Sequence, residues 1–248
     1  VHVIGAGVMG GDIAAWCALR GLRVTLQDQS PERIAPAIKR AAALFKKRLK
    51  KPRLIQAAMD RLIPDVNGLG VKTADVVIEA IFENLEAKQE LYKILEPQMK
   101  PEALLTTNTS SIPIEELSVA LDKPGRLVGL HFFNPVAKMQ LIEIVSGKKT
   151  YSEAGKAAAS FARQIGRLPL PVKSTPGFLV NRILMPYLLE AVELLSEGVQ
   201  AELIDKVALD FGMPMGPVEL ADTVGLDICL SVAEILTAHL GGTVPELL

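Results

Sequence analysis

The chain has 248 residues, of which 49% are hydrophobic and 22% are charged, and its formal net charge is −1. This length accommodates one large domain or two smaller ones, and the near-zero net charge excludes a general attraction to nucleic acid. Because no apolar run reaches membrane-spanning length, we expect no membrane span, and we expect no secretory signal. Cys17 and Cys229 lie in apolar stretches without metal-binding spacing, which predicts buried free thiols, no metal site and a reducing, cytoplasmic compartment.

Residues 1–4 form a short apolar run that leads directly into the glycine-rich stretch 5–10, G-A-G-V-M-G. A strand followed by G-x-G-x-x-G and a helix is typical of a pyrophosphate-binding turn. In this pattern Gly5 permits the tight turn, Gly7 lets the backbone approach the phosphates, and Gly10 lets the helix pack closely on the strand. The start of the chain therefore predicts a dinucleotide-binding domain.

Asp28 ends a second predicted strand, and it follows the first glycine at about the 20-residue spacing expected of the carboxylate that binds the adenosine ribose hydroxyls. No arginine directly follows Asp28 to neutralise a 2′-phosphate, so the sequence favours NAD over NADP. The alternative is that Asp28 is only a turn residue that closes the strand.

Strand and helix patterns alternate up to about residue 147. Pro36 is unexpected inside one of the helical patterns, which it would kink or start late. Alternation of this kind predicts an α/β fold: a Rossmann-type, doubly wound and mainly parallel sheet with helices on both faces. The predicted strands are 1–4, 24–27, 76–78, 104–107, 127–130 and 141–145, and the predicted helices are 11–20, 31–51, 85–96 and 114–121.

The pattern changes after residue 150. We expect a helix at 152–165 and a strand at 168–172, which Pro169 and Pro171 exclude from a central position in the sheet. Only helical patterns follow, at 177–197, 201–211 and 217–240. The sequence therefore predicts a Rossmann-type nucleotide-binding domain at 1–172 and an all-helical C-terminal domain at 173–248.

Residues 46–53, K-K-R-L-K-K-P-R, form the densest cluster of basic side chains. Cations offset the dipole at the carboxyl end of a helix, so a solvated helix end is the simplest interpretation. The alternative is a contact surface for a polyanionic group, such as the phosphates of coenzyme A.

Four polar residues occupy positions that suit chemistry. Ser110 and His131 lie at the ends of predicted strands, where open α/β sheets bind their ligands. Glu143 interrupts an apolar strand, and a buried carboxylate there needs a partner, for which a histidine is the natural choice. A carboxylate beside one ring nitrogen fixes the tautomer and makes the other nitrogen a better base, so the pair could remove a hydroxyl proton as hydride leaves the substrate.

Asn181 stands at the head of the first long helix of the C-terminal domain. Together with Ser110 it could hold the substrate oxygen and orient the reacting carbon toward the cofactor. Three of these residues also have an ordinary interpretation: His131 as a core or turn histidine, Ser110 as a capping or turn residue and Asn181 as a polar residue inside a helix. The combination of all four favours a dehydrogenase site.

Six segments of the chain resemble L-3-hydroxyacyl-CoA dehydrogenases, and most closely the dehydrogenase part of bacterial multifunctional fatty-acid oxidation proteins. They are 5–10 (GAGVMG), 79–85 (EAIFENL), 108–111 (NTSS), 131–135 (HFFNP), 175–178 (TPGF) with 180–182 (VNR), and 214–217 (PMGP). The resemblance covers essentially the whole chain. It implies NAD-dependent oxidation of an L-3-hydroxyacyl-CoA to the 3-ketoacyl-CoA, a step of fatty-acid β-oxidation.

The resemblance also implies roles for single residues. His131 would be the catalytic base and Glu143 its partner, while Ser110 and Asn181 would contact the substrate, Ser110 also lying near the nicotinamide. Three of the cofactor contacts depend on the resemblance alone, namely Glu83, Lys88 and Asn134. The full set implied for the cofactor is Gly5, Gly7, Met9, Gly10, Asp28, Glu83, Lys88, Ser110 and Asn134.

For partners, the resemblance implies an acyl-CoA substrate and either a homodimer or a place in a multifunctional oxidation complex. Because the family usually continues with further helices, we expect the C-terminal domain to be truncated and the chain to have low activity by itself. Two alternatives stay open: a related dehydrogenase that acts on a CoA-free hydroxy acid, and a non-catalytic NAD-binding module.

Overall fold

The computed structural model describes residues 1–241 and 243–245, so residue 242 and residues 246–248 of the predicted C-terminal domain lie outside the described residues. The chain divides into two compact units, Val1–Ser174 and Thr175–Leu248.

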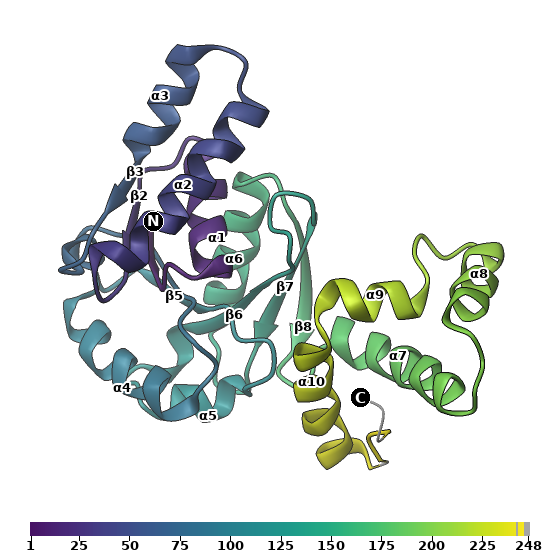
Figure 1. Ribbon diagram of the computed structural model, residues 1–248. Helices are drawn as coiled ribbons and strands as arrows, with labels where there is room; N and C mark the ends of the chain where they lie inside the picture. Colours follow the sequence, from purple (N-terminus) through teal and green to yellow (C-terminus); the bar gives the residue numbers. More distant parts are fainter. Residues whose placement is uncertain (242, 246–248) are drawn as a thin grey trace. The chain divides into compact units, whose positions relative to one another are not determined.

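An eight-stranded sheet forms the centre of the first unit (Figure 1). In spatial order its strands are β3 (Leu62–Pro64), β2 (Val24–Gln27), β1 (His2–Ile4), β4 (Val76–Glu79), β5 (Leu104–Thr107), β6 (Leu127–Phe132), β7 (Leu141–Ser146) and β8 (Leu168–Lys173). Neighbouring strands are parallel except β6 and β7, which are antiparallel. The prediction of a doubly wound, mainly parallel sheet is confirmed, as is the position of β8 at an edge.

The strand order reverses between β1 and β4. From β1 the chain proceeds outward to β2 and β3, and it then returns to the other side of β1 to build β4 and the remaining strands. The loops that leave β1 and β4 therefore diverge onto opposite faces of the sheet and leave a crevice between them, which is where open α/β sheets bind ligands.

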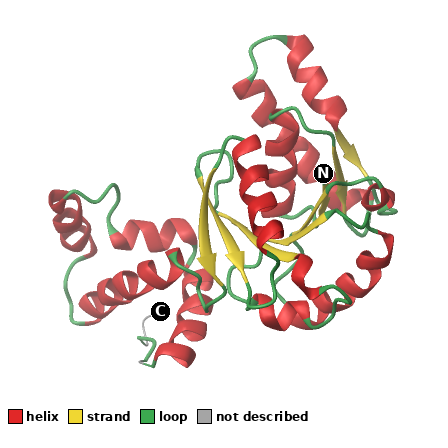
Figure 2. Ribbon diagram, turned by 180° about the vertical axis from the view of Figure 1, so that it is seen from behind, coloured by secondary structure: helices red, strands yellow, loops and turns green. Residues whose placement is uncertain are grey.

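Helices cover both faces of the sheet. The helices α1 (Val8–Leu19), α2 (Pro31–Arg48) and α6 (Ser152–Gln164) bury their apolar sides in one core with strand residues such as Val3, Leu26 and Leu130. Figures 1 and 2 show α4 (Leu85–Leu95) and α5 (Ile114–Ser118) on the other face. Three short 3₁₀ helices complete the unit: Leu69–Lys72, Glu96–Gln98 and Pro124–Arg126.

The expected helix at 31–51 differs from the structure at its end. The helix α2 stops at Arg48, and Pro52 begins a separate helix, α3 (Pro52–Arg61), which leads into β3. Proline suits the first position of a helix, where no N–H is needed, so Pro52 marks a start and not an interruption. Pro36 lies on the exposed side of α2, where solvent can reach the backbone, and the helix continues through it.

The second unit contains four helices among its described residues: α7 (Val180–Ser196), α8 (Ala201–Phe211), α9 (Pro217–Val224) and α10 (Leu226–Leu240). The helices α7, α9 and α10 share a core that includes Met185, Leu188 and Leu236, and α8 packs mainly against α9. The single helix expected at 217–240 is interrupted by Gly225, whose φ of 104° is incompatible with a helix. Across the described residues, every helix is too short or too polar to cross a membrane.

Candidate functional site

A cleft of about 1080 Å³ opens beside the carboxyl ends of β1 and β4. The glycine-rich turn lines it on one side, with Gly5, Gly7 and Met9. Asp28, after β2, Glu83, before α4, and Ser110, after β5, also line it. The fold thus brings six of the predicted site residues to one crevice.

The glycines of the turn have different surroundings. A side chain at Gly5 would collide with the backbone of Ala80, and a side chain at Gly10 would collide with the carbonyl oxygen of Gly5. At Gly7, by contrast, a side chain would meet nothing within 4 Å. Gly5 and Gly10 therefore let the strand, the turn and α1 pack closely, while Gly7 leaves free space at the start of a helix, which fits the approach of a pyrophosphate.

Asp28 is fixed at the rim of the cleft by two backbone groups. Its Oδ2 accepts a hydrogen bond from Ala6 N at 2.7 Å, and its Oδ1 accepts one from Gln29 N at 2.7 Å. A carboxylate has about four acceptor positions, so Asp28 keeps capacity for a ribose diol. The first of these bonds also ties the end of β2 to the glycine-rich turn.

His131 and Glu143 form a hydrogen-bonded pair. They stand directly opposite each other on the antiparallel strands β6 and β7, so both side chains project from the same face of the sheet. His131 Nδ1 lies 2.7 Å from Glu143 Oε2, and the two residues are 5% and 0% exposed. The ring of Phe133 packs at 4.5 Å from the imidazole. This arrangement fixes the ring orientation of His131 and buries a carboxylate beside it.

Glu83 holds the loop that carries Ser110. Its Oε1 accepts hydrogen bonds from the hydroxyl groups of Thr109 and Ser111 and from the backbone N–H groups of Ser110 and Ser111. Burial alone would raise the pKa of Glu83, but the Lys88 ammonium and the bonds from Thr109 and Ser110 outweigh it and hold this pKa below its usual value. The carboxylate is therefore ionised at neutral pH and organises the loop.

The remaining predicted residues lie apart from the cleft lining. Lys88 is 1% exposed and sits behind Glu83, to which it is ion-paired at 3.3 Å. Asn134 follows β6 and is exposed. Asn181 lies in the first turn of α7 and belongs to the second unit, so the fold of the first unit does not by itself bring it to His131.

Two residues that the sequence marked only as parts of motifs, without a role of their own, contribute to the geometry of the site. Asn108 donates its backbone N–H to Glu79 O at 2.8 Å and accepts a hydrogen bond from Phe132 N at 2.9 Å, so it joins β4, the Ser110 loop and the end of β6. Glu79 is a fully buried carboxylate at the end of β4. Like Glu143, Glu79 is a lone acid in an apolar strand, a pattern that predicts a buried carboxylate with polar partners.

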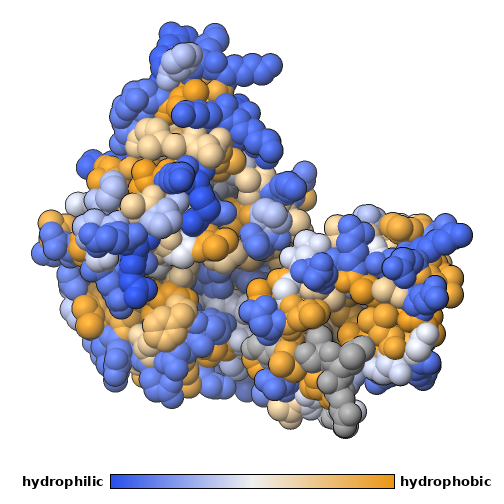
Figure 3. All heavy atoms as spheres, in the orientation of Figure 1, coloured by the Kyte–Doolittle hydropathy of each residue, from blue (hydrophilic) through white to orange (hydrophobic). Residues whose placement is uncertain are grey.

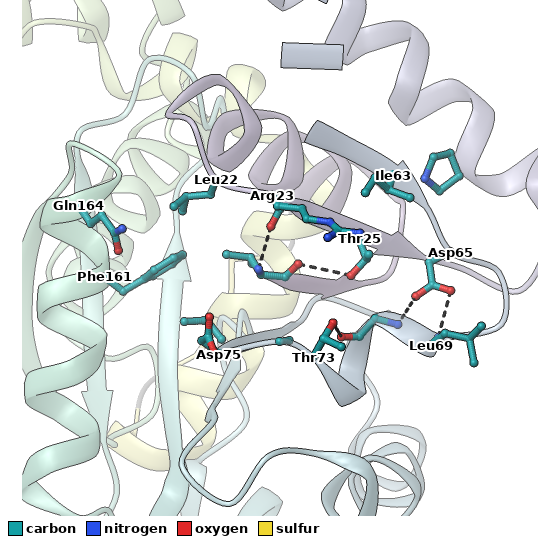
Figure 4. A pocket seen from close by; sticks show the side chains of 15 residues that line it. Leu22, Arg23, Thr25, Ile63, Asp65, Leu69, Thr73, Asp75, Phe161 and Gln164 are labelled. Carbon is teal, nitrogen blue, oxygen red and sulfur yellow. Dashed lines mark hydrogen bonds between the residues drawn. The ribbon is translucent and has the colours of Figure 1, made fainter. Parts of the chain in front are cut away.

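A second cavity, of about 550 Å³, lies near the opposite ends of the strands, around Arg23, Thr25 and Asp75 (Figure 4). Figure 4 shows that the Asp65 carboxylate is engaged by the chain itself, since it accepts hydrogen bonds from Leu69 N and Gly70 N. None of the predicted site residues, all of which the structure describes, lines this second cavity.

The basic cluster at 46–53 lies at the connection between α2 and α3, and all its lysines and arginines are exposed. Figure 3 shows hydrophilic side chains covering this part of the surface. Arg48 bonds through its guanidinium to Ala137 O at 2.9 Å, which anchors the end of α2 to the loop after β6.

Comparison with known proteins shows two family models that match consecutive parts of the chain. The family described as "3-hydroxyacyl-CoA dehydrogenase, NAD binding domain" matches residues 1–175, and "3-hydroxyacyl-CoA dehydrogenase, C-terminal domain" matches residues 177–247.

Curated relatives include the fatty acid oxidation complex subunit alpha of Pseudomonas entomophila, which is 41% identical over 229 residues, covering 91% of this chain and 32% of the relative. The chain thus spans about a third of the length of such relatives. Among solved structures, a 3-hydroxybutyryl-CoA dehydrogenase from Escherichia coli is 40% identical, with a TM-score of 0.91 over 96% of this chain and 52% of that one. The (S)-3-hydroxybutyryl-CoA dehydrogenase PaaH1 from Ralstonia eutropha is 34% identical, with a TM-score of 0.92 over 97% of this chain and 87% of that one.

Proposed function

Because the chain belongs to the 3-hydroxyacyl-CoA dehydrogenase family, we propose that it oxidises an L-3-hydroxyacyl-CoA to the 3-ketoacyl-CoA, as a step of fatty-acid β-oxidation. Family membership confirms the resemblance expected from the motifs, and the domain matched by residues 1–175 is an NAD-binding domain, so the cofactor is NAD. The observation that carries the proposal is the buried contact between His131 and Glu143, one strand away from the Ser110 loop.

In this reaction the substrate alcohol loses a proton and a hydride. His131 takes the hydroxyl proton, and the Glu143 carboxylate at its Nδ1 stabilises the resulting imidazolium. NAD, when bound, accepts the hydride from carbon 3. The electron pair of the O–H bond becomes the second bond of the ketone as the C–H pair departs, so protons and electrons balance.

Ser110 and Asn181 orient the substrate oxygen in this proposal, and Ser110 also approaches the nicotinamide. Gly5, Gly7, Met9 and Gly10 would hold the pyrophosphate of the cofactor. Support comes from the free space at Gly7 and from the cleft that this turn shares with Ser110. Asp28 would bind the adenosine ribose, and Glu83 and Asn134 would contact the cofactor. Lys88 would act on the cofactor site through Glu83, to which it is ion-paired.

The test replaces the proposed base in the full chain. His131→Gln should lower kcat by about 10²- to 10⁴-fold, because a glutamine cannot take the proton, while the affinity for NAD stays close to that of the wild type. NADH formation from an L-3-hydroxyacyl-CoA measures kcat, and titration calorimetry measures the affinity. His239→Gln is the matched control, since His239 is exposed on α10 in the second unit and should leave both quantities unchanged.

Unchanged turnover in His131→Gln would contradict the role of this histidine as the base. A higher kcat/KM with a free L-3-hydroxy acid than with its CoA thioester would instead show that the substrate is a CoA-free hydroxy acid. NAD binding without turnover on either substrate would leave only a nucleotide-binding role.

We also propose that the chain acts in the cytoplasm, either as a homodimer or within a larger fatty-acid oxidation complex. Relatives carrying the name of such a complex support the second arrangement. The first is supported by α8, on which Leu203, Val207 and Phe211 recur every fourth residue and are 53%, 60% and 87% exposed. Light scattering of the purified chain measures its mass, and a monomer at all concentrations would contradict the homodimer.

A further inference from the structure

A buried carboxylate outside the proposed chemistry stands behind the cofactor cleft. Glu79, at the end of β4, is 0% exposed and makes four hydrogen bonds. Its Oε1 accepts from Lys88 Nζ at 2.6 Å and from Ile81 N at 2.8 Å. Its Oε2 accepts from Tyr92 Oη at 2.8 Å and from Thr107 Oγ1 at 2.7 Å. Each oxygen of this buried acid thus accepts two hydrogen bonds, which fixes the orientation of its side chain.

Lys88 connects this acid to the cleft. Its ammonium lies 2.6 Å from Glu79 and 3.3 Å from Glu83 Oε2, so one buried cation serves two carboxylates. The shorter contact is with Glu79, on the side away from the cleft. Glu83 therefore uses Oε2 for the ammonium and has Oε1 for the four donors of the Ser110 loop.

We propose that Glu79 is a positioning residue of the cofactor site: by holding Lys88 it keeps Glu83 Oε1 committed to the loop that carries Ser110. This inference rests on the proposed function, because it concerns how the cofactor cleft is kept in its binding shape. Without the charge of Glu79, the buried ammonium of Lys88 has only Glu83 as an ion-pair partner among the described residues. It then draws both oxygens of Glu83 toward itself and releases the loop.

The two oxygens of Glu79 allow a structural role to be separated from a positioning role. The Oε2 side contacts Tyr92 and Thr107, which are both buried. Burial, and then the charge of Glu79, raise the pKa of Tyr92 well above its usual value, so the phenol stays protonated and donates. Tyr92→Phe removes a buried hydrogen bond to the same acid but leaves the Lys88 side intact, and it is the matched control.

The experiment compares Glu79→Gln, Glu79→Asp and Tyr92→Phe in the full chain. Glu79→Gln should raise the Kd for NAD about tenfold or more, the effect expected for loss of a charge-assisted contact. Backbone amide exchange at Ser110 and Ser111 should accelerate in the absence of cofactor. Glu79→Asp keeps the charge and should recover part of both effects. Tyr92→Phe should lower the unfolding midpoint while leaving the Kd and the exchange at Ser110 and Ser111 within about twofold of the wild type.

Equal effects of Glu79→Gln and Tyr92→Phe on the Kd and on loop exchange would overturn the inference, because both would then report general loss of stability. Wild-type exchange in Glu79→Gln would also overturn it. Should Glu79→Gln not fold, the double variant Glu79→Gln, Lys88→Met also removes the ammonium that would draw Glu83 from the loop. Exchange at Ser110 should then stay close to that of the wild type, and accelerated exchange in this variant would overturn the inference. Failure of the wild-type chain to bind NAD would contradict the proposed function, while the exchange measurement would still decide whether Glu79 positions the loop.

Discussion

Glu143 is fully buried and contacts His131 through a 2.7 Å hydrogen bond, so removing its charge tests how the imidazole is supported. Glu143→Gln keeps the shape of the side chain but cannot stabilise an imidazolium. We expect kcat to fall at least about 10- to 100-fold, the cost of removing the carboxylate partner of a metal-ligating histidine, with a smaller change in KM. Steady-state NADH formation measures both constants. A kcat equal to that of the wild type, in a variant with a normal unfolding midpoint, would show that the carboxylate only fills the core.

The contact between Glu143 and His131 could be predicted from the sequence because each residue stands out within its own strand. A lone acid in an apolar strand needs a partner, and the strand pairing then places position 143 opposite position 131. The contacts of Glu83 could not be derived in this way. They join residues 26 to 28 positions apart through a loop whose shape depends on Asn108 and Thr109, and no periodic pattern encodes such a loop.

At the scale of elements, the glycines of the turn between β1 and α1 have two different roles, close packing of the chain and binding of the cofactor. A side chain at Gly10 would collide with the Gly5 carbonyl, whereas one at Gly7 would meet no protein atom within 4 Å. Gly10→Ala should therefore lower the free energy of unfolding of the first unit by at least about 1–3 kcal/mol, the usual cost of overpacking a core. Gly7→Ala should leave stability within about 0.5 kcal/mol and weaken NAD binding at least tenfold, because its methyl group occupies the approach to the phosphates.

Urea unfolding and NAD titration of the same two variants check this separation. Each glycine variant serves as the control for the other, since both add one methyl group to the same turn. Loss of stability in Gly7→Ala, or normal NAD binding by it, would contradict the assignment of this position to the cofactor.

Helices and strands could be predicted where the hydrophobic pattern was long. The prediction failed where a short element or a single residue set the boundary. The three residues of β3 and the ten of α3 were missed because both elements are short and neither carries a long periodic pattern. The break between α9 and α10 depends on the φ of 104° at Gly225, and a single glycine inside an apolar pattern does not by itself predict that conformation.

At the scale of the whole molecule, a buried histidine should make the stability of the fold depend on pH. His2 lies in β1 at the centre of the sheet and is 0% exposed. Its Nδ1 is 2.8 Å from Thr25 Oγ1, and its Nε2 is 2.9 Å from Gln27 Oε1. Burial lowers the pKa of His2 from 6.5, and neither the bond to Gln27 nor the Asp65 carboxylate, 3.9 Å from Nδ1, reverses this effect.

The sign of the dependence follows from proton uptake. Below about pH 6.5 an unfolded histidine binds a proton that the folded His2 does not, so the unfolded state gains stability as the pH falls. The contribution of His2 is therefore complete above pH 6.5 and is lost as the pH falls through that value toward the lower pKa of the folded state. We expect the free energy of unfolding to decrease between about pH 7.5 and pH 5.5 more steeply in the wild type than in His2→Gln, whose amide does not titrate in this range. Urea unfolding at several pH values measures both slopes, with the exposed His239→Gln as the control that should follow the wild type. Parallel slopes in the wild type and in His2→Gln would mean that His2 takes up its proton equally well in the folded chain, and the neutral, buried state of this histidine would then be wrong.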